Sequence, residues 1–225
     1  MFIFIHGMWA TPDIWHPFIH YFSERGIECT AVNLREGLDM RTARFQDYVQ
    51  KVAAIARDED VLIGHSMGGL IVQKVAECST IRAGVAIAPA PPKGIAFRKS
   101  AMPSSVRYLP HVILRKPFKP GYHFLKKLVF SCLDDEEARK MYGELEEEPP
   151  TVSYEIALSR IAVDETRVKC PLLFIAKEDD AVISPEMVKT MAAKYRAEYR
   201  VFSGCHVILD EWKDIAEEIH RFINK

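Results

Sequence analysis

The residues with the clearest chemical spacing are a serine and its flanking glycines, in the segment Gly64-His65-Ser66-Met67-Gly68. An apolar run at residues 60–63 precedes this segment, and a helix-compatible run at residues 67–77 follows it. In a sharp strand-to-helix turn, a serine is held in a strained conformation that exposes its hydroxyl. Glycine on both sides leaves room for that turn, because a side chain there would collide with the neighbouring element. The spacing therefore predicts that Ser66 is a nucleophile, rather than an incidental serine in a glycine-rich loop.

A serine hydroxyl is a poor nucleophile at neutral pH and needs a base within hydrogen-bond reach. His206 is the best placed of the eight histidines, because it lies in a turn at residues 203–206, directly after the last predicted strand. A side chain on that loop reaches over the C-terminal edge of a parallel sheet toward Ser66. We therefore expect His206 to be the general base, the alternative being an ordinary surface histidine.

The base in turn needs a carboxylate that fixes its tautomer and stabilises the imidazolium. The apolar run at residues 172–176 leads into Lys177-Glu178-Asp179-Asp180, again at the C-terminal end of a strand. We predict that Asp179 is this carboxylate. Asp180 and Glu178 are the alternatives one residue away, and a hydrated acidic turn is the interpretation without a catalytic role.

Backbone amides at two places are expected to stabilise the oxyanion that forms when a serine attacks a carbonyl. Met67 follows the serine at the start of a predicted helix, where N–H groups are free and the helix dipole favours negative charge. Met8 follows Gly7 in the loop after the first predicted strand and is the expected second donor. Two neighbours are candidate substrate contacts: His65, and Trp9, for which core packing is the alternative.

Strand and helix patterns alternate along the chain. Continuous apolar runs predict buried strands, and apolar residues three or four apart predict amphipathic helices. The expected strands are residues 2–5, 27–34, 60–63, 81–88, 171–176 and 198–202, and the expected helices are residues 13–25, 42–57, 67–77, 185–195 and 211–223. This alternation predicts a mostly parallel sheet with helices on both faces.

The interval between the fourth and fifth predicted strands interrupts the alternation. It opens with Pro89-Ala90-Pro91-Pro92, which continues neither a strand nor a helix well, and it is far too long for an ordinary loop. We predict an inserted helical lid at residues 91–167, in a core formed by residues 1–90 and 168–225. The first half of the lid is basic and the second half acidic, which favours a solvated face or mutual pairing over binding of an anionic substrate group.

These segments together resemble the α/β-hydrolase fold superfamily, and within it the serine esterases and lipases. The likeness lies in residues 4–9, 63–69, 172–185 and 204–206. The order Ser66, Asp179, His206 is the triad order of that superfamily. The resemblance implies an α/β fold and a minimal sheet of about six mostly parallel strands, since relatives often have two further strands before the first one here.

The resemblance also bears on the choice of the acid. In relatives the acid segment commonly reads Gly-x-x-Asp before a hydrophobic pair. Ala176-Lys177-Glu178-Asp179 fits this pattern with alanine in place of glycine, which favours Asp179 over Asp180. The usual Asp-Leu-Arg-Gly-His-Gly after the second strand is replaced by Asn33-Leu34-Arg35-Glu36-Gly37, a departure that affects no triad residue.

Composition narrows the class of protein. With 225 residues, 48% hydrophobic and 27% charged, the chain is typical of a soluble globular domain, and its formal charge of −1 favours neither nucleic acid nor an anionic membrane as partner. No apolar run approaches the ~18 residues of a membrane span, and the first residues do not resemble a signal peptide. The five cysteines are scattered and never spaced as C-x-x-C, which predicts reduced thiols in a cytoplasmic protein.

Two further groupings have simpler interpretations. His16 and His20 lie four apart on a predicted helix, but no third ligand is placed nearby, so we expect a surface pair and no metal site. Cys205 adjoins His206 in sequence and is expected to be a small buried residue in the turn rather than a second nucleophile.

The resulting hypothesis is a cofactor-free serine hydrolase that cleaves carboxylic esters, or thioesters, of small to medium acyl compounds through an acyl-enzyme on Ser66. The partner is then a small-molecule substrate. Fold and site geometry do not determine the substrate, so two alternatives stay open. The same triad serves acyl transfer or hydroxynitrile lysis in this fold, and a chain of this kind can also act as a small-molecule receptor with little turnover.

Overall fold

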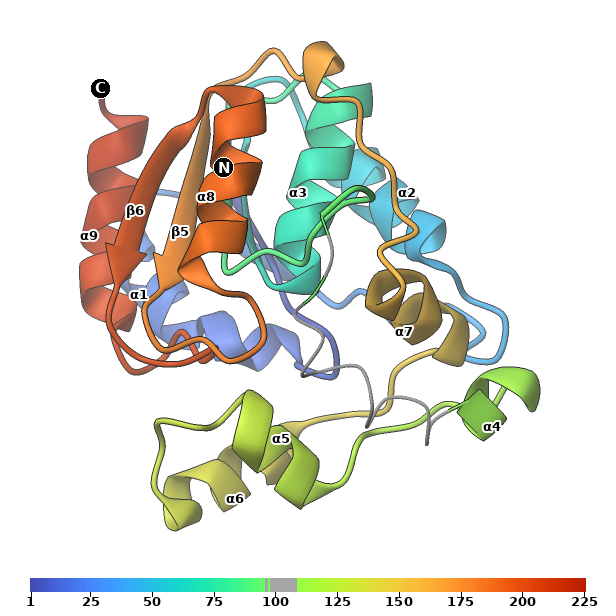
Figure 1. Cartoon of the computed structure of the whole chain (residues 1–225). Coiled ribbons are helices and arrows are strands. Elements are labelled where there is room, and N and C mark those ends of the chain that lie inside the picture. Colours follow the sequence, from blue (N-terminus) through green and yellow to red (C-terminus); the bar gives the residue numbers. More distant parts are fainter. Residues whose placement is uncertain (96, 98–108) are drawn as a thin grey trace.

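A single parallel sheet forms the centre of the molecule (Figure 1). The computed structural model describes residues 1–95, 97 and 109–225. Six strands are hydrogen-bonded in the order β2-β1-β3-β4-β5-β6, and every neighbouring pair is parallel. The strands are β1 (Phe2–Ile5), β2 (Cys29–Val32), β3 (Val61–His65), β4 (Ala83–Ile87), β5 (Leu172–Lys177) and β6 (Glu198–Phe202). The predicted parallel sheet of about six strands is confirmed.

Helices cover both faces of this sheet, because successive apolar side chains of each central strand point to opposite faces. In β1, Phe2 and Phe4 pack with α1 (His16–Ser23) and α9 (Trp212–Ile223), whereas Ile3 and Ile5 pack with α2 (Phe45–Ile55) and α3 (Met67–Cys78). Successive side chains of a strand point to opposite faces, so a strand that is apolar throughout needs cover on both. α8 (Pro185–Tyr195) packs on β5, on the same face as α3 (Figure 1).

The segment between β4 and β5 contains several short helices where the structure describes it. It contains α4 (Leu109–Ile113), α5 (Tyr122–Leu128), α6 (Asp135–Glu144), α7 (Pro150–Ala157) and the short 3-10 turn η4 (Glu165–Arg167); a second 3-10 turn, η1 (Pro12–Trp15), precedes α1. The arrowheads of β5 and β6 point toward α5 and α6, so these two helices lie beyond the C-terminal edge of the sheet (Figure 1). We call residues 91–167 the insertion.

Two lysines of the insertion form hydrogen bonds within the insertion itself. Lys119 donates to the Tyr142 and Leu145 carbonyls, and Lys126 donates to the Phe130 and Leu133 carbonyls. These two lysines thus cap chain turns of the insertion itself. The basic residues Arg98, Lys99 and Arg107 lie outside the described residues. Within the described ranges, no helix has both the length and the apolar composition that a bilayer crossing needs.

Candidate active site

Ser66 stands at a sharp turn between β3 and α3. Its backbone has φ 53° and ψ −115°, a conformation that L residues rarely adopt. Glycines make the turn possible. A Cβ on Gly64 would overlap the Gly68 carbonyl, and a Cβ on Gly68 would overlap the Ile5 carbonyl of the neighbouring strand. The turn therefore requires both glycines and presents the Ser66 hydroxyl at the C-terminal edge of the sheet.

His206 lies within hydrogen-bond reach of the Ser66 hydroxyl. Its Nε2 is 3.0 Å from Ser66 Oγ, and its Nδ1 is 2.7 Å from Asp180 Oδ2. The imidazole of His206 and the carboxylate of Asp180 are both almost fully buried. With Nδ1–H donating to Asp180, Nε2 has the lone pair that accepts the Ser66 proton. The structure thus joins a serine hydroxyl, an imidazole and a carboxylate in one chain of hydrogen bonds.

The carboxylate that bonds His206 is that of Asp180 and not that of Asp179, the residue predicted for this place. β5 extends to Lys177, which pairs with Phe202 of β6, one residue beyond the predicted end of the strand. The turn therefore starts later, and Asp179 points its exposed side chain to solvent while its amide donates to the Gly204 carbonyl. Asp180 turns inward instead.

Asp180 is held in place by backbone as well as by His206. Its Oδ1 accepts hydrogen bonds from the amides of Val182 and Ile183, at 2.7 and 2.8 Å. Each carboxylate oxygen consequently has its own set of donors. This arrangement fixes the carboxylate plane and leaves Oδ2 for the imidazole.

Two further buried histidines support the site. His65 Nε2 donates to the His206 backbone carbonyl at 2.9 Å, which anchors the loop that carries His206. Burial and the neighbouring His206 hold the pKa of His65 well below its ordinary value, so His65 is neutral at pH 7. His6 donates from Nδ1 to the Gly7 carbonyl and accepts at Nε2 from the Leu34 amide. Burial lowers the pKa of His6 to about 3. Sequence reasoning assigned His6 no role, although its place at the end of β1 was visible.

The predicted oxyanion loop adjoins Ser66. A Cβ built on Gly7 would lie 3.1 Å from Ser66 Cβ, so the chain at Gly7 passes directly against the serine. Met8 follows in the same loop and, like Ser66, lines the cavity described below. Met67 occupies the first position of α3, where a backbone N–H has no acceptor within the helix. Both predicted donors are thus next to Ser66 in the chain or in space.

A cavity of about 570 Å³ opens above Ser66 and His206. Its described lining contains no lysine, arginine, aspartate or glutamate. Apolar side chains from the insertion form much of it, together with residues of the loop that follows His206; among them are Phe118, Phe124, Leu125, Val129, Phe130, Met141, Leu145, Val207, Ile208 and Leu209. Trp9 and His65, the predicted substrate contacts, also line it. A cavity of this size and composition fits an uncharged, largely apolar organic molecule.

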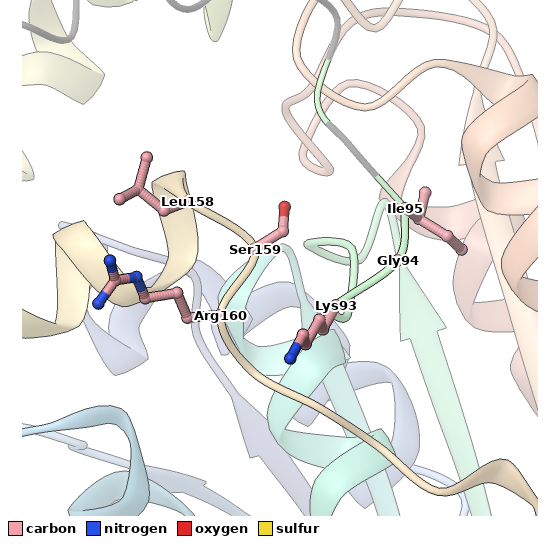
Figure 2. A pocket seen from close by; sticks show the side chains of 6 residues that line it. All are labelled: Lys93, Gly94, Ile95, Leu158, Ser159 and Arg160. Atoms are coloured by element: carbon pink, nitrogen blue, oxygen red, sulfur yellow. The ribbon is translucent and has the colours of Figure 1, made fainter.

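A second, open depression of about 680 Å³ lies at the surface between the start of the insertion and the end of α7 (Figure 2). It is lined by Lys93, Gly94, Ile95, Leu158, Ser159 and Arg160. None of the triad residues reaches it, and it shares only Leu158 with the apolar cavity. Among the described residues that line it, no base or acid is hydrogen-bonded to a nucleophile, so we assign it no chemistry.

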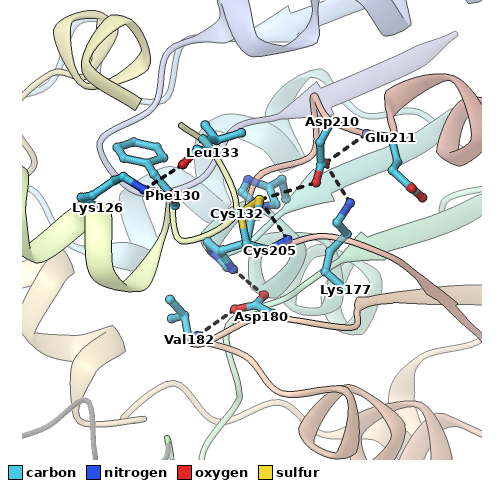
Figure 3. The surroundings of a disulfide bond; sticks show 12 residues. Lys126, Phe130, Cys132, Leu133, Lys177, Asp180, Val182, Cys205, Asp210 and Glu211 are labelled. Atoms are coloured by element: carbon cyan, nitrogen blue, oxygen red, sulfur yellow. Dashed lines mark hydrogen bonds and ion pairs between the residues drawn. A yellow bond between two sulfur atoms is a disulfide. The ribbon is translucent and has the colours of Figure 1, made fainter. Parts of the chain in front are cut away.

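A disulfide joins Cys132 of the insertion to Cys205, the residue before His206 (Figure 3). The prediction of five reduced cysteines was therefore wrong for these two, while Cys29, Cys78 and Cys170 are free thiols. The partners are separated by 73 positions, and only the packing of the insertion against the His206 loop brings them together. A cytoplasmic location was inferred from reduced thiols, and the disulfide removes that argument.

The disulfide and a buried ion pair hold the same loop. Lys177 is fully buried and donates to Asp210 Oδ1 at 2.8 Å (Figure 3). The two sulfurs and Asp210 are close enough together to hold a metal ion, but the sulfurs are bonded to each other and Asp210 is paired with Lys177. The cluster therefore serves to fasten the loop. With its sulfur in the disulfide, Cys205 offers no thiolate as a second nucleophile.

The histidine pair on α1 lies at the surface, as expected. His16 and His20 are mostly exposed and approach Asp13 and Glu24, respectively, at 3.4 Å. Each imidazole thus faces an acidic side chain on the same surface rather than a shared ligand position.

The comparisons with known proteins agree with this fold. The family model described as "Alpha/beta hydrolase family" matches residues 2–218. A lipase-esterase related protein from Clostridium acetobutylicum superimposes with a TM-score of 0.78 at 21% identity, over 98% of this chain and 93% of that one. A search of curated proteins found no match.

Two other solved structures are similar over most of their length. An extracellular alpha/beta-hydrolase from a Paenibacillus species has a TM-score of 0.75 at 19% identity, covering 98% of this chain and 97% of that one. A carboxylesterase from the thaumarchaeon Nitrososphaera gargenis has a TM-score of 0.76 at 18% identity, covering 99% and 90%. At these identities the likeness establishes the fold.

Proposed function

Because the chain belongs to the alpha/beta hydrolase family, we propose that this enzyme is a serine hydrolase that cleaves carboxylic esters with an apolar acyl or alcohol part. One observation carries the proposal: the hydrogen-bonded chain Ser66–His206–Asp180 stands at the floor of an apolar cavity. That chain supplies an activated nucleophile, and the cavity supplies a dry binding site for the substrate.

The reaction follows from the positions of the groups. Ser66 Oγ attacks the ester carbonyl carbon while His206 Nε2 takes the hydroxyl proton. The carbonyl oxygen becomes an oxyanion, and the backbone amides of Met8 and Met67 donate to it. The tetrahedral intermediate collapses, the carbon–oxygen bond to the alcohol breaks, and His206 returns its proton to the leaving oxygen. Asp180 stabilises the imidazolium throughout.

Water completes the cycle. It enters after the alcohol leaves, gives a proton to His206 and attacks the acyl-enzyme carbonyl. The second intermediate collapses to release the carboxylic acid, and the proton returns to Ser66 Oγ. A thioester follows the same steps with a thiol as leaving group. We propose that the insertion at residues 91–167 acts as a lid, since its described residues form much of the cavity wall over Ser66 and His206.

The direct test combines a nucleophile variant with an active-site probe. Wild-type protein should hydrolyse p-nitrophenyl esters and be labelled by a fluorophosphonate at Ser66, whereas Ser66→Ala should do neither while keeping its far-UV circular dichroism. Undiminished ester turnover by Ser66→Ala would sink the proposal. Product analysis with added alcohol or cyanide separates hydrolysis from acyl transfer and hydroxynitrile lysis.

A further inference from the structure

Glu148 is a fully buried carboxylate outside the proposed triad, in the segment that connects α6 to α7. Its Oε2 accepts from the Trp9 backbone N–H at 2.9 Å and from Arg35 Nη1 at 3.1 Å. Its Oε1 accepts from the Tyr48 hydroxyl. Burial raises the pKa of this carboxyl, and Arg35 together with the hydrogen bonds to the carboxylate opposes that rise. Three donors from three separate parts of the core thus converge on one side chain of the insertion.

Trp9 needs such support, because it holds a backbone conformation that a bulky residue seldom adopts. Its φ is +64°, in the left-handed region that favours glycine. Hydrogen bonds from the insertion hold it on both sides. Its N–H donates to Glu148, its carbonyl accepts from the Glu146 amide at 2.8 Å, and its indole Nε1–H donates to the Phe118 carbonyl at 3.2 Å. The conformation persists because the surroundings determine it.

The position of Trp9 matters for the proposed chemistry. The Trp9 N–H belongs to the peptide that directly follows Met8, so holding this N–H fixes one side of Met8. On the other side of Met8, Gly7 passes directly against Ser66. A donor aimed at an oxyanion must be held to a few tenths of an ångström, because a misplacement of about 1 Å costs roughly 100-fold in rate.

We propose that Glu148 is a positioning residue for the oxyanion loop: it holds the Trp9 amide and thereby aims the backbone N–H of Met8 at the developing oxyanion. The inference rests on the proposed ester hydrolysis. It also gives the insertion a second task, since Glu148 couples this segment to the catalytic loop through buried hydrogen bonds. Arg35 adds to this coupling, because its Nη2 also donates hydrogen bonds to the Ala10 carbonyl and to the Glu146 carboxylate.

Two conservative substitutions separate positioning from a purely electrostatic role. Glu148→Gln keeps the length of the side chain, so its carbonyl oxygen still reaches the Trp9 N–H and its amide donates to the Tyr48 oxygen. Glu148→Asp keeps the charge near Arg35 but shortens the side chain by one methylene, which withdraws the acceptor from Trp9. Positioning predicts that Glu148→Gln is the more active variant. A role as counter-ion to Arg35 predicts the reverse order.

The measurements are kcat and KM for a p-nitrophenyl ester, the inhibition constant of an apolar trifluoromethyl ketone, and the thermal midpoint. A trifluoromethyl ketone forms a hemiketal oxyanion on the serine, so its affinity reports the oxyanion donors. We expect Glu148→Asp to lower kcat on the order of 10- to 100-fold, with KM nearly unchanged and ketone affinity lowered in parallel. Glu148→Gln should stay within about threefold of wild type for both kcat and ketone affinity, since its acceptor still reaches Trp9.

Tyr48→Phe is the matched control. It removes a hydrogen bond to the same carboxylate but none to the oxyanion loop, and it should lower the thermal midpoint while kcat and ketone affinity stay at wild-type values. The proposal is overturned if Glu148→Asp keeps wild-type kcat and ketone affinity, or if it exceeds Glu148→Gln in activity. Failure of the proposed function looks different, because wild-type protein would then hydrolyse no ester and Ser66 would take no fluorophosphonate.

Discussion

Replacing Asp180 by asparagine should remove nearly all activity without unfolding the protein. Asp180 Oδ1 accepts from the Val182 and Ile183 amides, and Oδ2 accepts from His206 Nδ1–H at 2.7 Å. An asparagine keeps its single carbonyl oxygen on the two backbone amides, because its NH₂ group offers no acceptor to them. The NH₂ group must then face His206 Nδ1.

That orientation forces the wrong tautomer on the base. With a donor facing it, Nδ1 becomes the acceptor and the ring proton moves to Nε2, which is the atom 3.0 Å from Ser66 Oγ. Nε2 then has no lone pair for the serine proton. The loss of a correctly oriented base corresponds to a fall in kcat of about 10⁴-fold, or about 5.5 kcal/mol in activation free energy.

Asp179→Asn is the matched control, since its side chain is exposed and only its backbone amide is used. Steady-state hydrolysis of a p-nitrophenyl ester at pH 7 to 8 should show wild-type kcat for Asp179→Asn and a drop of several orders of magnitude for Asp180→Asn. Circular dichroism and the thermal midpoint should be nearly unchanged in both. If Asp179→Asn were the inactive variant, or Asp180→Asn remained within tenfold of wild type, the assignment of the acid would be refuted.

Three further predictions concern the disulfide, the cavity and the buried His6. The Cys132–Cys205 disulfide spans 73 positions, so Cys132→Ser should lower the free energy of unfolding by about 4 kcal/mol in denaturant titrations, while Cys78→Ser at an exposed free thiol should not. Because no charged residue is among the described lining of the cavity, kcat/KM for short p-nitrophenyl esters should rise about fourfold per added methylene until the cavity is filled; a flat series, or a preference for an anionic hemisuccinate ester, would contradict this. The pKa of His6 falls from 6.5 to about 3 on folding. The contribution of neutral His6 to the free energy of unfolding is therefore fully present above pH 6.5 and is lost as the pH falls toward 3. The loss amounts to about 3 kcal/mol at pH 4. Chemical denaturation of wild type and His6→Asn between pH 7 and 4 checks this, and an equal loss of stability in both proteins would refute it.

The fold could be predicted from the sequence because its signals are local. Short apolar runs such as residues 2–5 and 172–176 favour buried strands, and their alternation with amphipathic helices leads to a parallel sheet. Ser66 and His206 follow from the same logic, since each stands in a turn just after a strand. Parallel strands end at a common edge, so residues in those turns meet.

The acid could not be chosen with the same certainty. Asp179 and Asp180 are neighbours in one turn, and which of them faces inward depends on where β5 ends. The strand ends one residue later than its apolar run, because Lys177 pairs with Phe202 and buries its ammonium against Asp210. In the sequence, Lys177 looks like the end of the strand, because the aspartate that pairs with its ammonium is more than thirty positions away.

The sequence by itself determined the sheet and pointed to Ser66 and His206 as the proposed nucleophile and base, because glycine spacing and strand ends are properties of short segments. Only the tertiary structure decided which aspartate completes the hydrogen-bonded chain, that Cys132 and Cys205 are joined, that Glu148 supports the oxyanion loop and that the cavity is apolar. Each of these features depends on contacts between the site and the insertion or a distant turn. Such contacts arise from how whole elements pack against one another, and no local pattern of residues encodes that packing.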